Sequence, residues 1–191
     1  MDSIDHTILH RASKGDLSAF QYIYEKTSDF IYAIAYRIIN NRSDAQDITQ
    51  DVFVKLYQNF RVFADCASFK PWLYRIAVNT AINTYNDKRR IRRNHEQYQQ
   101  CAGTDMTPPE VEARLSQEDA EDTLGDLLAM LPLEQRTVIV LREIEGLNYQ
   151  QIAETLEINI NTVRTRLKRG RLKLMEATKR GVVKNELQKN L

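Results

Sequence analysis

Residues 161–174, NTVRTRLKRGRLKL, combine a regular apolar spacing with six Lys or Arg residues and no Asp or Glu. At about 100° per residue, the segment divides into two faces of one helix. The apolar face is expected to meet a core and consists of Val163, Leu167, Gly170 and Leu174. The opposite face is polar and basic and consists of Thr162, Thr165, Lys168 and Arg169, flanked by Arg164, Arg166 and Arg171.

The residues before this segment predict a second, shorter helix. Asn148 followed by Gln151 is a capping box, which satisfies free backbone N–H groups where a helix begins. A tight turn over 157–160 leads to Asn161, which can cap the long helix, and the pair forms a helix-turn-helix. Basic side chains neutralise phosphates, and Thr or Arg on the first turns can reach base edges in the major groove. The pattern predicts DNA contact, with a merely solvated basic helix as the alternative.

The chain as a whole has 191 residues and a formal net charge of only +1. Its 42% hydrophobic residues suffice for packed cores, and its 6 Gly and 4 Pro are typical of a helix-rich protein of one or two domains. The charge is unevenly distributed, because residues 88–93 (KRRIRR) and 164–173 are basic, whereas 105–122 contain seven Asp or Glu residues and one Arg. A near-neutral sum therefore does not exclude a nucleic-acid partner.

Several classes of protein are disfavoured. The N-terminus lacks a signal-peptide layout and no apolar run approaches the ~20 residues of a membrane span, so a cytoplasmic location without membrane insertion is expected. Cys66 and Cys101 form no C-x-x-C pair and are expected to be reduced thiols. His6 and His10 lack partners of suitable spacing, so no metal or other cofactor is expected. No P-loop, nucleophile elbow or triad is found, and the chain is not expected to be an enzyme.

The first half of the chain predicts successive helices. Asp16 can cap a helix that begins at Leu17, and Ser43 with Gln46 forms another capping box. Pro71 suits the first turn of a helix through WLYRIAVNTAINTY, residues 72–85. The helix after Ser43 has a predicted buried side that consists of Ala45, Ile48, Val52 and Leu56.

A linker separates the two halves. Residues 94–110 lack apolar periodicity and contain Gly103 and the pair Pro108 and Pro109. The second domain is expected to begin near Leu124, and TVIVL (137–141) is expected to be helical because its neighbours are. The predicted fold is all-α, with two small helical domains joined by a flexible acidic linker.

Four segments, in collinear order, resemble parts of bacterial sigma factors. LPLEQRTVIVLREIEGLNYQQIAETLEININTVRTRLKRGRLKL (131–174) is similar to region 4. GDLSAFQYIYEK (15–26) is similar to region 2.1, SDAQDITQDVFVKLY (43–57) to region 2.2, and SFKPWLYRIAVNTAIN (68–83) to regions 2.3 and 2.4. The short acidic linker, with no third domain, resembles the extracytoplasmic-function type. The resemblance covers about residues 12–175.

This resemblance implies a non-catalytic subunit that binds core RNA polymerase, through the largest-subunit clamp helices and the flap, and directs it to promoter DNA. It implies region 2 over 1–93, a linker over 94–122, a region 4 helix-turn-helix over 123–180 and a tail over 181–191. It also implies an anti-sigma factor as a partner. The alternative is a stand-alone helix-turn-helix regulator with an N-terminal sensor or dimerisation domain, but such a domain has no reason to carry both region 2 motifs in order.

Asp47, Gln50 and Asp51 share one helix face, away from Ile48 and Val52. Taken alone, this is an ordinary solvated acidic face. By resemblance, it matches the motif that grips the polymerase clamp helices, where the acids can pair with Arg and the amide adds directional hydrogen bonds.

The helix around Trp72 and the loop before it match the segment that binds the non-template strand of the minus-ten element. By resemblance, a pocket for a flipped base is formed by Phe63, Ala64, Asp65, Cys66, Ala67 and Ser68. The other expected minus-ten contacts are Lys70, Arg75, Asn79, Asn83, Lys88, Arg89 and Arg90. Many family members carry Arg at the position of Val78 and Asp at the position of Asn83. These differences concern which minus-ten sequence this helix recognises and not its role in binding the element.

The minus-35 element is expected to contact the basic helix. The side chains expected to do so are Thr162, Arg164, Thr165, Arg166, Lys168, Arg169 and Arg171. The acidic linker is either a plain tether or, by resemblance, a nucleic-acid mimic that threads toward the active-site channel of the polymerase.

Overall fold

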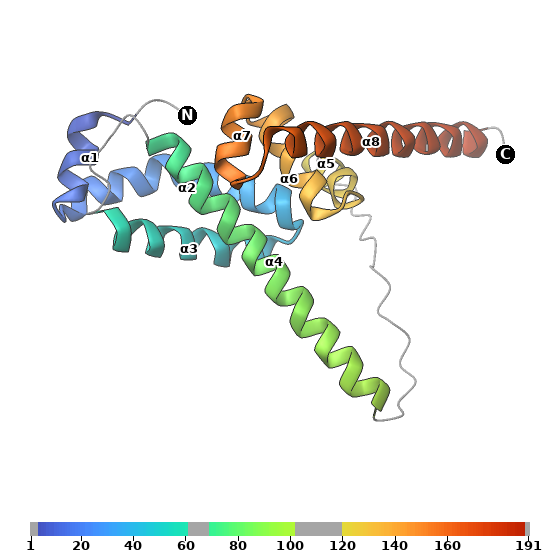
Figure 1. Cartoon of the computed structure of the whole chain (residues 1–191), viewed down its shortest axis with the longest axis horizontal. Helices are drawn as coiled ribbons and strands as arrows, with labels where there is room; N and C mark the ends of the chain where they lie inside the picture. The colour runs from blue at the N-terminus through green and yellow to red at the C-terminus, as the bar shows by residue number, and fades with distance from the viewer. Residues whose placement is uncertain (1–3, 61–68, 102–119, 190–191) are drawn as a thin grey trace.

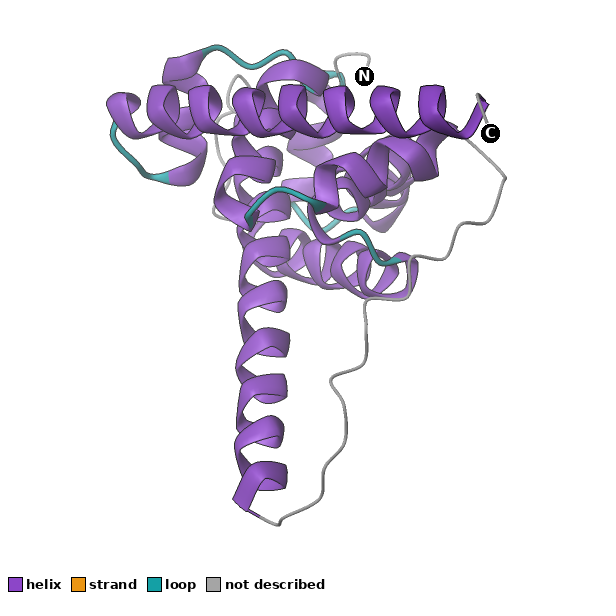
Figure 2. Cartoon of the chain, turned by 90° about the vertical axis from the view of Figure 1, so that its right-hand side faces the viewer, coloured by secondary structure: helices purple, strands orange, loops and turns teal. Residues whose placement is uncertain are grey.

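The computed structural model describes residues 4–60, 69–101 and 120–189. Within these ranges every regular element is helical, which confirms the predicted all-α class (Figure 2). The residues of TVIVL lie in helical backbone, as predicted. The elements in chain order are α1 (His6–Ser13), α2 (Leu17–Ile39), α3 (Arg42–Asn59), α4 (Phe69–Cys101), α5 (Ala120–Ala129), α6 (Leu133–Ile139), η3 (Val140–Ile144), α7 (Tyr149–Leu156) and α8 (Ile160–Lys189).

The N-terminal bundle consists of α1, α2, α3 and the first half of α4 (Figure 1). Helix α2 packs against the other three, and α3 packs against α4. The predicted inner side of α3 is confirmed, because Ala45, Ile48, Val52 and Leu56 are all fully buried. An apolar residue at every third or fourth position places these side chains on one stripe, which the bundle covers.

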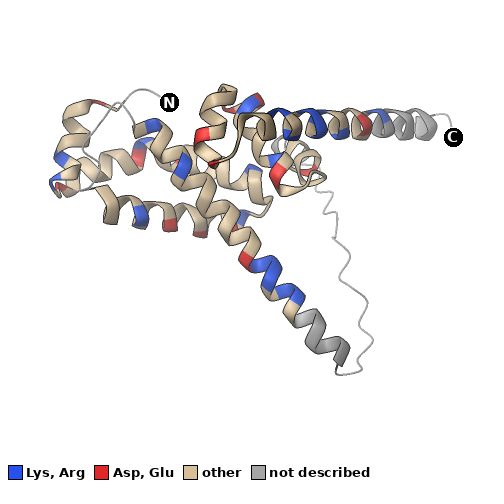
Figure 3. Cartoon of the chain, in the orientation of Figure 1, with Lys and Arg blue, Asp and Glu red and all other residues tan. Residues whose placement is uncertain are grey.

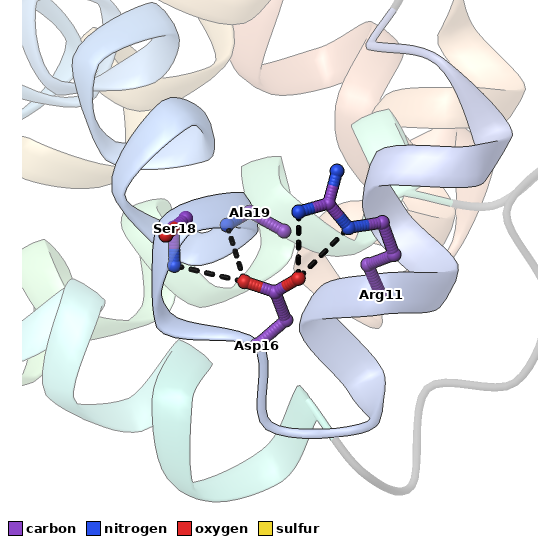
Figure 4. A network of polar contacts seen from close by, with 4 residues as sticks. All are labelled: Arg11, Asp16, Ser18 and Ala19. Carbon is purple, nitrogen blue, oxygen red and sulfur yellow. Dashed lines mark hydrogen bonds and ion pairs between the residues drawn. The ribbon is translucent and has the colours of Figure 1, made fainter.

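Asp16 begins α2 as predicted. Its carboxylate accepts hydrogen bonds from the backbone N–H groups of Ser18 at 3.0 Å and Ala19 at 3.1 Å (Figure 4). The guanidinium of Arg11, at the end of α1, donates to the other carboxylate oxygen at 2.8 Å. One side chain therefore caps α2 and joins it to the preceding helix.

The predicted capping box at Ser43 and Gln46 is wrong. Helix α3 begins one residue before Ser43, and its N-cap is Asn41, whose side chain accepts from the Asp44 N–H at 2.9 Å. Asn caps a helix as well as Ser does, and the extended backbone of Asn41 directs its side chain onto the first turn. Ser43 is left inside the helix.

Helix α4 is longer than the sequence predicts. It continues to Cys101, whereas the lack of apolar periodicity predicts a linker from residue 94, and its second half projects from the bundle (Figure 1). Helix α5 likewise begins at Ala120, before the expected start near Leu124. Apolar periodicity signals that a helix face is covered, but Arg, Gln and Glu have enough intrinsic propensity to extend a helix into solvent. The end of the periodicity therefore marks the end of the bundle and not of the helix.

The C-terminal bundle consists of α5, α6, η3, α7 and α8, with α8 packed against α5, α6 and α7. Gly146, with a φ of +72°, lies just after the end of the η3 segment, in the left-handed region that glycine adopts without strain. The two bundles also contact each other: α2 lies against α5, α6 and η3, and α4 lies against α7. Their buried residues form one continuous hydrophobic cluster. The sequence predicts two domains but not this contact.

Candidate nucleic-acid interface and acidic helix face

Helices α7 and α8 form the predicted helix-turn-helix. The Asn148 side chain accepts from the Gln151 N–H at 2.9 Å, and the Gln151 side chain accepts from the Asn148 N–H at 2.8 Å. This reciprocal pair confirms the predicted capping box at the start of α7. Glu157, in the left-handed region with a φ of 52°, ends α7 and turns the chain toward α8.

The start of α8 differs from the prediction by two residues. The Asn159 side chain accepts from the Asn161 N–H at 2.8 Å, and its carbonyl accepts from the N–H groups of Thr162 and Val163. Asn159 is therefore the capping residue, and the prediction of Asn161 is wrong. The Asn161 side chain instead accepts from the Arg164 guanidinium at 3.0 Å. Both Asn residues are suitable caps, and the conformation of the turn decides which one reaches the free N–H groups.

The predicted inner face of α8 is confirmed. Val163, Leu167 and Gly170 are buried, and Leu174 is partly buried. A Cβ on Gly170 would lie 2.9 Å from Ile139 Cγ1, so the glycine allows α8 to approach α6 closely. This close packing fixes the direction in which α8 presents its outer face.

The outer face of α8 carries four exposed side chains, Arg164, Thr165, Lys168 and Arg169. Figure 3 shows the basic residues along this helix. The Thr165 hydroxyl donates to the Asn161 carbonyl at 2.8 Å, and the residue remains exposed. Thr162 is partly buried. The structure thus brings most of the expected DNA-contacting residues together on one surface.

Two of the expected DNA-contacting arginines are engaged within the C-terminal bundle. The Arg166 guanidinium pairs with Glu134 of α6 at 3.0 Å, and Arg171 pairs with Glu143 of η3 at 2.6 Å. The hydrogen bond that the Arg171 guanidinium donates to the Glu143 carboxylate raises the pKa of Arg171 above its ordinary value. Because both ion pairs join α8 to the preceding helices, these two residues position the outer face. The pairing involves acids about thirty residues away, for which the local sequence carries no signal.

The residues expected to contact the minus-ten element lie along α4. Lys70, Arg75 and Asn83 are exposed, and Asn79 is partly buried. Lys70 and Arg75 line a cavity of about 1010 Å³, whose other wall is formed by the loop after η3 and by α7. The expected base pocket, Phe63, Ala64, Asp65, Cys66, Ala67 and Ser68, lies outside the described residues.

The basic run at 88–93 lies on the projecting part of α4, where all its residues are exposed (Figure 3). Two of its cations have acidic partners, since Lys88 pairs with Asp44 of α3 and Arg90 pairs with Asp87 at 3.1 Å. Arg89 and Arg90 also line a small groove beside Asn86. The run therefore presents cations on one projecting helix, and Lys88 additionally joins α4 to the start of α3.

The acidic face of α3 is arranged as predicted. Asp47, Gln50 and Asp51 are exposed, whereas Ile48 and Val52 on the other side are fully buried. The same face continues over two exposed residues, Val54 and Tyr57, which are not among the contacts expected from the sequence. Val54 lies four residues after Gln50 and three after Asp51, and Tyr57 lies three residues after Val54. This helical spacing is the signal that identifies them.

Within the described ranges, no three His, Cys, Asp or Glu side chains are grouped as a metal ion would need. No described helix is both long and apolar enough to cross a membrane.

Comparison with known families gives two matches that follow the two bundles. Residues 23–91 match Sigma-70 region 2, and residues 121–174 match Sigma-70, region 4. These ranges contain α3 with its acidic face and the helix-turn-helix with its basic face, respectively.

Among similar proteins, the ECF RNA polymerase sigma factor SigW of Bacillus subtilis (strain 168) is 36% identical over 175 residues, which cover 85% of this chain and 90% of the relative. The ECF RNA polymerase sigma-E factor of Haemophilus influenzae is 34% identical, covering 87% and 91% of the two chains. Among solved structures, CnrH in complex with the cytosolic domain of CnrY has a TM-score of 0.65 at 23% identity, covering 93% of this chain and 98% of that chain. The last likeness supports the fold, and the sequence relatives establish the family. The chain belongs to the ECF family of RNA polymerase sigma factors.

Proposed function

We propose that this chain binds core RNA polymerase and directs it to a bipartite promoter, as a binding factor and not as an enzyme. The observation that carries the proposal is the presence in one chain of two separate exposed surfaces, the basic face of α8 and the acidic face of α3. A DNA-binding regulator needs only the first surface. A protein that brings a polymerase to a chosen site needs both.

The polymerase is proposed to dock on the acidic face of α3. Asp47 and Asp51 can form charge-assisted hydrogen bonds with Arg side chains on the clamp helices, and Gln50 adds a directional hydrogen bond between them. Val54 and Tyr57 extend this face with apolar area, which a protein partner can bury and a nucleic acid would not require.

The minus-35 element is proposed to lie against the outer face of α8. Arg164, Thr165, Lys168 and Arg169 are exposed near the N-terminal end of the second helix of the pair, where helix-turn-helix proteins contact base edges. Arg166 and Arg171 hold this helix in position through their ion pairs and are proposed to add positive potential at its flanks.

The minus-ten element is proposed to run along α4. Asn79 and Asn83 lie one helical turn apart and can donate to and accept from bases, while Lys70, Arg75 and the basic run supply phosphate contacts. The proposed domain limits are 1–93, 123–180 and a tail at 181–191, with 94–122 between the bundles. Such a factor acts where polymerase and promoters are, in the bacterial cytoplasm.

Run-off transcription tests this function. Purified core polymerase is mixed with a library of double-stranded templates, with and without the chain, and the transcript starts are mapped. We expect start sites that depend on the chain and share two sequence elements upstream. A matched reaction with Lys168→Ala and Arg169→Ala combined is expected to lose selection of the upstream element. Starts that are the same with and without the chain would contradict the proposal.

The stand-alone regulator remains the second candidate, since α7 and α8 by themselves could bind an operator. It predicts DNA binding that is unaffected by core polymerase and a chain that forms dimers.

One solved relative is a sigma factor bound to the anti-sigma factor NepR from Bartonella quintana. We propose that this chain also has an anti-sigma partner, which co-purification from the native organism with the tagged chain would test.

A further inference from the structure

Asn161 is held in place by hydrogen bonds of its own backbone. Its N–H donates to the Asn159 side chain at 2.8 Å, and its carbonyl accepts from the Thr165 hydroxyl at 2.8 Å. It is the second residue of α8, directly after the turn of the helix-turn-helix. Because Asn159 caps this helix, the amide of Asn161 does not serve as the cap and can bond elsewhere.

The Asn161 amide holds the side chain of Arg164. Its oxygen accepts a hydrogen bond from Nη1 of Arg164 at 3.0 Å, and both residues are exposed. They are three positions apart on α8, which makes their side chains neighbours on the helix surface. An exposed Arg side chain otherwise samples many rotamers, and ordering it on binding costs conformational entropy. The bond to Asn161 removes part of that cost before DNA binds.

Arg164 has a different kind of partner from Arg166 and Arg171. Those two arginines pair with the carboxylates of Glu134 and Glu143, whose negative charges oppose theirs at close range. The amide oxygen that holds Arg164 is neutral and does not offset the charge of the guanidinium. Arg164 is therefore oriented by a neighbour and still carries the full positive charge that attracts DNA.

The bond to Asn161 does not involve the edge of Arg164 that best fits a base. A guanidinium carries five N–H donors in one plane, and Nη1 supplies the donor that Asn161 accepts. The edge formed by Nε and Nη2 has two parallel donors, which match O6 and N7 of guanine in the major groove. Arg164 lies near the start of α8, the part of the second helix that contacts base edges in helix-turn-helix proteins.

We propose that Asn161 is a positioning residue, which orients the Arg164 guanidinium to read one guanine of the minus-35 element. The bond between the two side chains is independent of function, whereas its use on a promoter rests on the proposed function. Asn161 acts through Arg164, so its loss weakens discrimination at one base pair. The fold and the affinity for other sequences stay almost unchanged.

A selection from randomised duplexes tests the proposal. The full-length chain, with and without core polymerase, is used as wild type, Asn161→Ala, Arg164→Ala and the double variant, and the bound duplexes are sequenced. We expect one position at which Arg164→Ala reduces a preference for guanine about tenfold or more. Asn161→Ala is expected to reduce it about two- to tenfold, the worth of one hydrogen bond. The double variant should match Arg164→Ala, because Asn161 has no effect once its partner is absent.

Gln150→Ala is the matched control. It removes another exposed bond between side chains, to Glu154 at 2.9 Å in α7, and should keep the guanine preference of the wild type. Urea denaturation should give similar, small losses of stability for Gln150→Ala and Asn161→Ala. A loss of discrimination in Asn161→Ala alone would then reflect positioning and not a change in the fold.

A wild-type guanine preference in Asn161→Ala would overturn the proposal, and so would a loss in the double variant larger than that in Arg164→Ala. The absence of any guanine position that depends on Arg164 would overturn it as well. If core polymerase neither bound the chain nor changed the selected sequences, the proposed function would be wrong. The guanine preference of the chain alone would then still decide the role of Asn161.

Discussion

The guanidinium of Arg171 donates to one carboxylate oxygen of Glu143 at 2.6 and 2.9 Å, and so ties α8 to the η3 segment. Arg169, two residues earlier, is exposed on the outer face. The sequence assigns both arginines to DNA contact, but their surroundings predict different roles. Arg169 is expected to contact the duplex directly, and Arg171 is expected to hold α8 in position.

Arg169→Ala is expected to weaken binding to a minus-35 duplex by about 1–3 kcal/mol, the worth of a good contact from Arg to a base. Arg171→Ala is expected to weaken it less and to lower the free energy of unfolding by up to ~1 kcal/mol, as an exposed ion pair does. Fluorescence anisotropy and urea denaturation measure the two quantities. Equal losses of DNA affinity in the two variants would contradict this division of roles.

Asp51→Arg is expected to weaken the complex with core polymerase by about 2 kcal/mol or more, because it replaces a paired charge with a repelling one. Its free energy of unfolding should stay close to that of the wild type, since the side chain is exposed. The control is Asp29→Arg, an equal charge change at an exposed position of α2 outside the acidic face. Normal holoenzyme formation by Asp51→Arg in a pull-down would rule out this face as the docking surface.

The capping residue of α8 can be tested by a pair of substitutions. Asn159→Ala is expected to lower the free energy of unfolding by about 1 kcal/mol, because it leaves the Asn161 N–H without its acceptor. Asn161→Ala removes a bond to the Arg164 side chain at the surface and is expected to cost less. Urea denaturation of the two variants decides between them, and the reverse order of stability would restore Asn161 as the cap.

The cap at Asp16 predicts a pH dependence. The Ala19 N–H and the Arg11 guanidinium lower the pKa of Asp16 below its ordinary value of 3.8. A lowered folded-state pKa contributes stability above the ordinary value and loses it as pH falls through the folded value. The difference in unfolding free energy between wild type and Asp16→Ala should therefore be constant from pH 7 to about 5 and shrink below about 4.

Asp16→Asn serves as the control, because Asn keeps a cap acceptor without a titrating charge. Its difference in unfolding free energy from the Asp16→Ala variant should be the same at all these pH values. A gap between wild type and Asp16→Ala that grows toward acid would contradict the role of the ionised carboxylate.

Features that depend on neighbours within one or two helical turns could be predicted from the sequence. The caps at Asp16 and Asn148, the buried stripe of α8 and the exposed position of Asp47, Gln50 and Asp51 are of this kind. Each follows from helical spacing or from a side chain that bonds to its own backbone nearby. Local patterns did not identify the capping residue where two nearby residues could each cap the helix. This was so for Asn41 and Ser43 at α3, and for Asn159 and Asn161 at α8.

The sequence by itself determined the helical class, the order of the motifs and the two faces that α3 and α8 present, because hydrophobic periodicity and capping are local. Only the tertiary structure decided which arginines are engaged by Glu134 and Glu143 and how closely Gly170 lets α8 approach α6. It also decided that the bundles meet, through bonds such as that from Arg136 to Ile38, which are 98 residues apart. Such contacts depend on how distant surfaces fit together, and no periodicity along the chain encodes that fit.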